Sequence, residues 1–121
     1  MDSLRCALLA ARAASSKQGS DILVLDVREV ITITDYFVII SASSDRQVST
    51  IGEEIVRALK EAGVRPVRRE GEAGARWLLL DFVDFVVHVF HEEEREFYGL
   101  ERLWRDAPVV EALETAEASS G

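Results

Sequence analysis

The segment WLLLDFVDFVVHVF, residues 77–90, constrains the fold of this chain more than any other feature. It contains two apolar runs, 77–82 and 85–90, with only Val83 and Asp84 between them. Two such runs joined by two residues predict a β-hairpin. Alternation along the second run places Val86, His88 and Phe90 on one face of the sheet, and the residues between them on the other. Because both faces are apolar, we expect helices to cover both sides of the sheet.

The rest of the chain supplies those helices and further strands. Apolar residues at helical spacing predict a helix over 3–17, and Ser44 with Gln47 has the spacing of a capping box before a second helix that ends at Gly63. DILVLDV and the run through Ile40 predict strands, and Pro66 limits VRPVRRE to a short edge strand. Helical turns are expected over about 92–104, and Pro108 ends that element. The predicted order is α-β-β-α-β-β-β-α, an α/β domain with a mixed sheet over residues 1–107. An acidic tail over 108–121 is expected to be disordered.

Length and composition narrow the class of protein. A chain of 121 residues suits one domain with a single core. No run is long and apolar enough for a membrane span. Asp2 and Arg12 interrupt the N-terminal apolar stretch, so we interpret it as an amphipathic helix of a cytoplasmic protein and not as a signal peptide. Cys6 is the only cysteine, which excludes an intrachain disulfide.

The net charge of −8 is concentrated near the C-terminus. From His91 onward nine acidic residues face three basic ones, whereas the first ninety residues carry thirteen acidic and eleven basic ones. An acidic surface repels phosphate backbones, so we expect little or no direct contact with nucleic acid. It favours encounter with a basic protein.

The aspartates and histidines of the hairpin raise the question of a catalytic or metal site. Metal-binding carboxylates on one strand are two residues apart, because side chains at i and i+2 point the same way. Asp81 and Asp84 are three apart, and Asp84 suits a turn. His88 lies inside a strand and His91 just past its end, with no nucleophile paired to either in the sequence. We predict no catalytic residue, no metal site and no cofactor.

The stretch from Ser41 to Asp45 leaves one enzymatic alternative open. A strand that runs into small residues and a helix N-terminus can bind an anion, as in the phosphate loop of a nucleotidyltransferase. This stretch lacks glycine, and no carboxylate pair follows it at the required spacing. A helix cap is the better interpretation.

Aromatic residues beside acidic ones indicate a surface that binds protein. EREFYGLERLW places Phe97, Leu100 and Trp104 on one helical face, most of which we expect to face the core. Trp77, Tyr98 and Trp104 are too many large aromatics for full burial in so small a domain. Partly exposed Trp and Tyr are typical of binding hot spots.

These residues also carry a family resemblance. DILVLDV, ITDYFVIISASSDRQV, the EG before a Trp, WLLLDFVDFVVHVF and REFYGLERLW followed by DA resemble the ribosomal silencing factor family, also called RsfS or Iojap. The resemblance spans roughly residues 4–107. The family commonly has an aromatic-Gly-Asp turn in the hairpin, where this chain has Val83. Because Val tolerates a positive φ badly, the turn here is expected to be of another type or slightly rearranged.

The resemblance implies a nucleotidyltransferase-like fold without enzymatic activity. Members bind the large ribosomal subunit, chiefly through its ribosomal protein numbered fourteen, block joining of the small subunit and lower translation when nutrients are scarce. They are often homodimeric when free. The candidate partner-binding residues are Trp77, Asp81, Asp84, His88, Tyr98, Glu101 and Trp104. Two alternatives remain: an assembly or maturation factor of the large subunit that uses the same surface, and a residual nucleotide-binding protein that uses Ser41 to Asp45.

Overall fold

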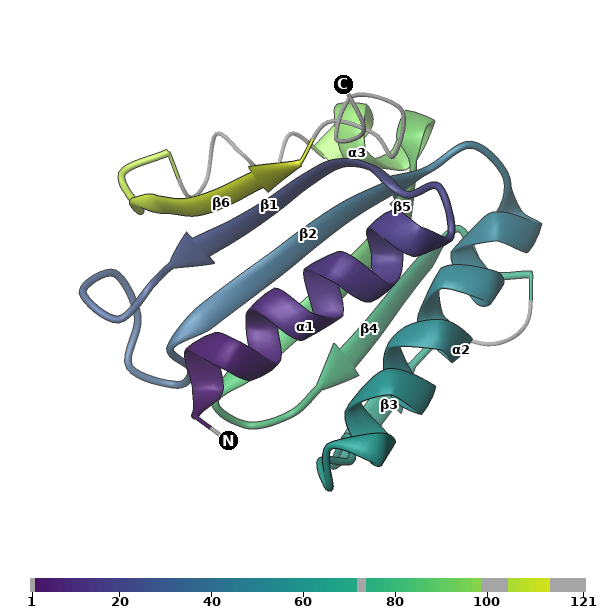
Figure 1. Cartoon of the computed structure of the whole chain (residues 1–121). Helices are drawn as coiled ribbons and strands as arrows, with labels where there is room; N and C mark the ends of the chain where they lie inside the picture. The colour runs from purple at the N-terminus through teal and green to yellow at the C-terminus, as the bar shows by residue number, and fades with distance from the viewer. Residues whose placement is uncertain (1, 72–73, 99–104, 114–121) are drawn as a thin grey trace.

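The computed structural model describes residues 2–71, 74–98 and 105–113, which form a layer of helices on a sheet (Figure 1). In that part of the chain the sheet has six strands in the order β3-β4-β5-β2-β1-β6. The elements in chain order are α1 (Ser3–Ser16), β1 (Ser20–Asp26), β2 (Tyr36–Ala42), α2 (Asp45–Glu61), β3 (Arg68–Glu70), β4 (Trp77–Asp81), β5 (Phe85–His91), α3 (Glu92–Tyr98) and β6 (Val109–Leu113).

The parallel pair β2–β5 lies at the centre of the sheet. It pairs continuously from Tyr36 opposite Phe85 to Ala42 opposite His91. Every other neighbouring pair is antiparallel. A parallel pair needs a crossover connection, and α2 with β3 and β4 supplies it. The predicted mixed sheet is therefore confirmed, as are the hairpin and the short edge strand after Pro66.

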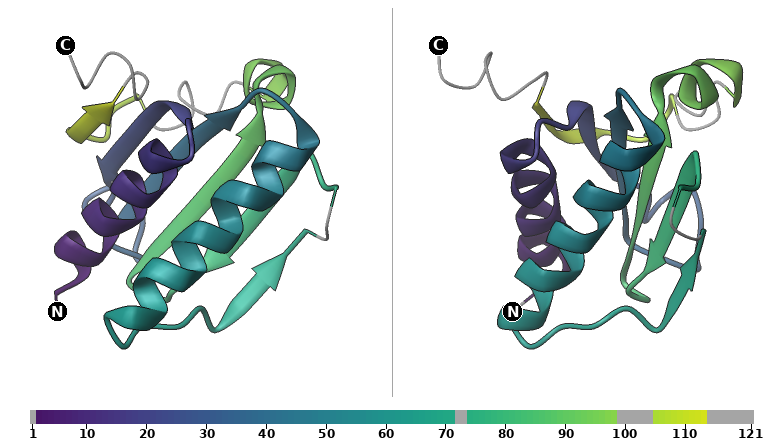
Figure 2. Two further views of the ribbon diagram at one scale, coloured as in Figure 1. Left: turned by 45° about the vertical axis from the view of Figure 1, so that its right-hand side comes forward. Right: turned by 90° about the vertical axis from the view of Figure 1, so that its right-hand side faces the viewer.

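One face of the sheet carries the main core, against which both α1 and α2 pack (Figure 2). Helix α1 contributes small residues such as Ala7, Ala10 and Ala14, so it lies close to the strands. Helix α2 contributes a stripe of larger ones. The sheet side chains of this core include Val38, Ile40, Leu78, Leu80, Phe85, Val87 and Val89.

The opposite face differs from the expectation that helices cover both sides. Because α1 and α2 share one face, neither covers the other. A smaller cluster lies there instead, formed by Leu25, Val27, Phe37, Ile39, Phe90 and Ala107. These side chains pack on one another along β1, β2 and β5. Toward β4 the described residues leave apolar side chains only partly buried. Apolar character on both faces therefore did not require two helical layers.

The C-terminal region also differs from the prediction. Val109–Leu113, placed in the disordered tail by sequence, form the edge strand β6 and pair antiparallel with β1. The apolar pair Val109-Val110 suits a strand, and β6 satisfies backbone groups along an edge of β1. Of the helix expected over 92–104, the structure describes α3 to Tyr98. Residues 99–104 and 114–121 lie outside the described part.

The predicted capping box at the start of α2 is confirmed in modified form. Ser44 Oγ accepts a hydrogen bond from the Gln47 N–H at 3.1 Å. Gln47 Oε1 returns to Ser43 and not to Ser44, accepting from the Ser43 N–H at 2.6 Å. The Gln47 side-chain amide also donates to the backbone oxygens of Lys17 and Gln18, which joins the start of α2 to the end of α1.

The β4–β5 turn places Val83 in a strained conformation. Its φ is +75°, and the Asp84 N–H donates to the Phe82 carbonyl at 3.0 Å, which closes a γ-turn around Val83. Asp81 Oδ1 accepts from the Val83 N–H at 2.8 Å and supports the turn from one side. Positive φ is unfavourable for a β-branched residue, so the hairpin forms with local strain.

Replacing Val83 with glycine is expected to stabilise the protein. Glycine adopts positive φ without the steric penalty, and we expect a gain of about 1 kcal/mol after the larger chain entropy of the unfolded state is subtracted. Urea denaturation of V83G and the parent measures it. Val30→Gly is the matched control, since Val30 is also exposed and has no positive φ. Equal destabilisation by both changes would contradict strain at Val83.

Candidate functional site

The face of the sheet opposite α1 and α2 is the candidate site. Trp77, Leu79 and Asp81 alternate onto it from β4 and lie opposite Phe90, His88 and Val86 of β5, respectively. The intervening residues of both strands point into the main core. We call the partly exposed surface formed by Trp77, Leu79, Asp81, Val86 and His88 the open face.

An aromatic cluster holds Trp77 in place on the open face. The Trp77 ring lies 4.7 Å from the Phe90 ring and 6.0 Å from the His88 ring, centroid to centroid. His88 also meets Phe37 edge to face at 5.3 Å. The indole Nε1–H donates to His88 Nδ1 at 3.3 Å. Trp77 nevertheless keeps 37% of its surface exposed. The large ring is thus both oriented and accessible.

Burial controls the ionisation of His88. Desolvation lowers its pKa to about 4, because charging an imidazole away from water is unfavourable. The ring is therefore neutral at pH 7. Since an indole can only donate, Nδ1 must be the acceptor, and the remaining proton sits on Nε2. His88 acts here as an orienting partner of Trp77.

Two hollows open on this side of the sheet. The first, of about 360 Å³, is lined by Glu70, Gly71, Trp77 and Leu79. The second, of about 330 Å³, we call the Thr34 hollow. It is lined by Ile33, Thr34, Phe37, Arg68, Leu79, Asp81, Val83, Val86 and His88. Leu79 belongs to both hollows, so they adjoin.

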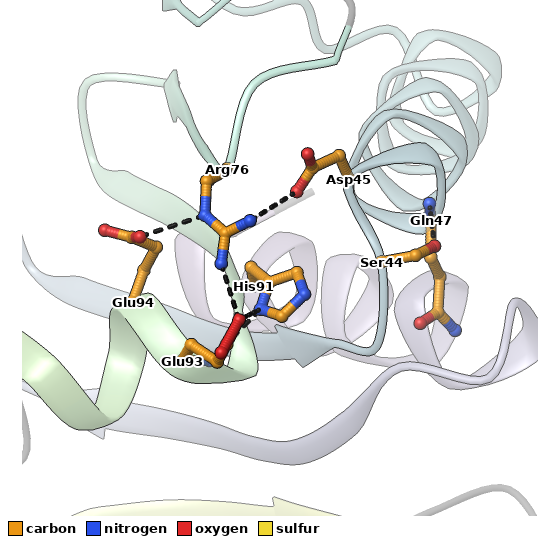
Figure 3. Close-up of polar contacts among 7 residues, drawn as sticks. All are labelled: Ser44, Asp45, Gln47, Arg76, His91, Glu93 and Glu94. Carbon is orange, nitrogen blue, oxygen red and sulfur yellow. Dashed lines mark hydrogen bonds and ion pairs between the residues drawn. The ribbon is translucent and has the colours of Figure 1, made fainter.

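An exposed charge cluster lies at the other end of β4 (Figure 3). Arg76 donates to Glu94 and Glu93 at 2.9 Å each, and its Nη1 lies 3.5 Å from a carboxylate oxygen of Asp45. The carboxylates of Glu94 and then Glu93 raise the pKa of Arg76 above its ordinary value. Arg76 therefore links the start of α3 to the start of α2, immediately beside Trp77.

His91 adds to the same junction. Its Nδ1 accepts a hydrogen bond from the Glu93 N–H at 3.1 Å, which satisfies a donor in the first turn of α3. The backbone N–H of His91 donates to the Arg76 carbonyl at 2.8 Å. In Figure 3 the imidazole lies beside Glu93. This histidine thus has a structural role at the strand–helix boundary.

A buried arginine attaches α3 to the sheet. Arg95 is 7% exposed, and its Nη1 donates to Ser41 Oγ at 2.8 Å and to the carbonyl of Asp21. Ser41 belongs to β2 and Asp21 to β1, so one side chain joins three elements. This attachment fixes where α3 leaves the sheet.

The stretch proposed as a phosphate cradle is occupied by the chain itself. Ser41 is buried and bound by Arg95, and Gln47 takes the Ser43 N–H and hydroxyl. Ser44 serves as the N-cap. Within residues 2–71, 74–98 and 105–113, no group of three His, Cys, Asp or Glu side chains is placed to hold a metal ion. No helix in the same ranges is long and apolar enough to cross a membrane.

The structure brings together three of the residues selected by sequence: Trp77, Asp81 and His88 lie on the open face. Asp84 lies in the β4–β5 turn, where its carbonyl accepts from the Asp35 and Tyr36 N–H groups. Tyr98 is the last residue of α3, and its side chain lies outside the described part of the chain. Glu101 and Trp104 lie outside it as well.

Sequence reasoning missed Thr34, Phe37, Arg68 and Leu79. Alternation along YFVIISA could have indicated that Phe37 shares a face with Ile39, and hence with His88 opposite it. The others depend on pairing between β3, β4 and the segment before β2. No local pattern reports such pairing.

Comparison with known proteins identifies relatives over most of the chain. The family model described as ribosomal silencing factor during starvation, RsfS, matches residues 1–121. The chain is 45% identical over 103 residues to the ribosomal silencing factor RsfS of Bacillus subtilis, covering 85% of this chain and 87% of that protein. It is 36% identical over 108 residues to the chloroplastic protein Iojap of Zea mays, covering 89% of this chain and 47% of that protein.

Solved structures share the fold. A crystal structure of a protein from Chromobacterium violaceum superposes with a TM-score of 0.82 at 35% identity, covering 86% of this chain and 87% of that one. A second, from Bacillus halodurans, gives a TM-score of 0.78 at 37% identity, covering 89% and 98%.

The buried neutral His88 predicts a specific dependence of stability on pH. Its pKa is lower in the folded state than the ordinary 6.5, so the unfolded state binds the proton first as pH falls. From pH 6.5 to 4 the His88 contribution to the free energy of unfolding should decline by up to roughly 3 kcal/mol. Urea denaturation of parent and His88→Gln across that range measures it as a narrowing difference. His91→Gln should retain the decline, and a pH-independent difference for His88→Gln would contradict the assignment.

Proposed function

The chain belongs to the RsfS family of ribosomal silencing factors, and from that premise we propose that it silences translation by docking on the large ribosomal subunit. Its contact is the ribosomal protein numbered fourteen of that subunit. The bound domain occupies the surface that the small subunit would meet, so joined ribosomes cannot form. Translation falls accordingly when nutrients are limiting. The action is steric and needs no chemical step.

The observation that carries this proposal is the oriented, accessible Trp77 on the open face. Hot spots of protein interfaces are enriched in Trp, and rigid aromatic side chains lose little conformational entropy on binding. Trp77 is held by Phe90 and His88 before any partner arrives. The hollows on either side of Leu79 offer concave apolar surface to a partner.

The charge distribution supports a basic protein partner. Glu92 and Glu93 are exposed on α3, next to the end of β5. With a net charge of −8 the chain attracts a basic ribosomal protein and is repelled by surrounding RNA phosphates. Asp84 at the turn adds a further exposed carboxylate. Tyr98, Glu101 and Trp104 stay in the proposed contact set on the sequence pattern alone.

Truncating Trp77 is expected to impair docking. Trp77→Ala should cost about 2–4 kcal/mol of binding, because it removes the central aromatic ring of the interface. Co-sedimentation of the purified protein with isolated large subunits, small subunits and joined ribosomes on a gradient measures it. The parent should bind large subunits and reduce joined particles when both subunits are mixed.

Val110→Ala is the matched control for that experiment. Val110 is 39% exposed, close to the value for Trp77, but lies on β6 at the other edge of the sheet. It should bind as the parent does. A folded Trp77→Ala variant with parental affinity would show that the open face is not the docking surface, and a parent that binds no particle would overturn the silencing role.

A second candidate is a factor for assembly of the large subunit. The chain is 38% identical over 91 residues to a mouse protein named mitochondrial assembly of ribosomal large subunit protein 1, covering 73% of this chain and 40% of that protein. The same docking surface would serve both roles. Preference for precursor particles over mature large subunits in the gradient would favour assembly.

The nucleotide-binding alternative makes a contrary prediction. A ligand of the folded state raises the melting temperature by mass action, so a nucleotide site would raise it at about 1 mM Mg-nucleotide. We expect no shift, because Gln47 and Arg95 already use the groups between Ser41 and Ser44. A melting temperature that rises with nucleotide concentration would revive the alternative.

A further inference from the structure

The Thr34 hollow has the features of a pocket for one particular side chain of the partner. Its walls come from the segment before β2, from β2 to β5 and from the β4–β5 turn. Ile33, 82% exposed, and Val83, 53% exposed, stand at its rim. The lining includes the apolar side chains of Phe37, Leu79 and Val86.

Thr34 contributes a polar group that lacks a partner. The residue is 5% exposed, and its Oγ1 makes no hydrogen bond within the described part of the chain. Buried hydroxyls are normally paired, because losing water without a replacement hydrogen bond is unfavourable. A group that enters the hollow and pairs with this oxygen would recover that loss.

Asp81 supplies a carboxylate oxygen at the same place. Its Oδ1 accepts the Val83 N–H, whereas Oδ2 lies 3.8 Å from Arg68 Nη2, beyond hydrogen-bond distance. Arg68 lies closer to Glu70, at 3.4 Å. His88 is neutral at pH 7 and adds no positive charge. The hollow thus combines apolar walls, an unpaired hydroxyl and an incompletely paired carboxylate.

We propose that the Thr34 hollow receives an arginine side chain of the docked protein. The methylene stem would lie on Phe37, Leu79 and Val86. The guanidinium carries only donors, which suits the Thr34 oxygen and Asp81 Oδ2 as acceptors. Pairing of Asp81 with a guanidinium is favoured in such partly desolvated sites. This inference rests on the proposed docking function and adds a specificity pocket to it, next to Trp77.

Thr34→Val tests the hydroxyl with two readouts of opposite sign. The change keeps the shape and removes the oxygen. Urea denaturation of the free protein should show equal or greater stability, because an unpaired buried group is lost. Affinity for isolated large subunits, measured by co-sedimentation over a range of protein concentrations, should fall roughly tenfold. A purely structural role would move both readouts downward.

Asp81→Asn tests the carboxylate. Asparagine keeps an oxygen for the Val83 N–H, so the turn should persist. Affinity should fall roughly tenfold and depend less on salt concentration, because one charge pair is removed. Thr50→Val on α2 is the matched control for the Thr34 change: it is exposed, lies outside the hollow, and should bind as the parent does.

The outcomes separate this inference from the docking function itself. If the parent binds and Trp77→Ala does not, while Thr34→Val and Asp81→Asn bind as the parent does, the pocket is overturned and docking stands. If Thr34→Val destabilises the free protein, the hydroxyl has a partner already and the pocket is overturned too. If the parent fails to bind large subunits, the docking function itself is wrong.

Discussion

The central parallel pair β2–β5 is the constraint on which the rest of the structure depends. Its strands are apolar on both faces, from Tyr36 opposite Phe85 to Ala42 opposite His91. The two long helices bury only one of those faces. The other face therefore has to pack on itself, as around Phe37 and Phe90, or stay partly open, as at Trp77. An incompletely covered apolar sheet face is a structural basis for binding another protein.

Local patterns predicted what local physics decides. The hairpin, the central strands and the cap of α2 follow from apolar runs, turn residues and the Ser44–Gln47 spacing, and the structure confirms them. The predicted helical cover on both faces failed, because apolar residues on a strand do not say whether a helix or a partner will cover them. Strand β6 was missed since its pairing with β1 joins residues far apart in sequence.

The candidate site divides in the same way. Trp77, Asp81 and His88 were found because alternation places residues two apart on one face. The indole–imidazole hydrogen bond links residues 11 apart on paired strands, so predicting it requires the register of β4 against β5. His88 illustrates why a histidine in an apolar strand need not be catalytic. Burial keeps it neutral, and a neutral ring can accept the hydrogen bond that fixes the orientation of Trp77.

Strain at Val83 and the shape of the open face are physically connected. The positive φ forced by the γ-turn is unfavourable for valine, yet the same side chain, 53% exposed, stands at the rim of the Thr34 hollow. Glycine would relieve the strain and remove the rim. Strained residues persist where their surroundings determine them, often beside functional sites. The Asp81 carboxylate both supports this turn and faces the hollow, so turn geometry and pocket chemistry depend on one residue.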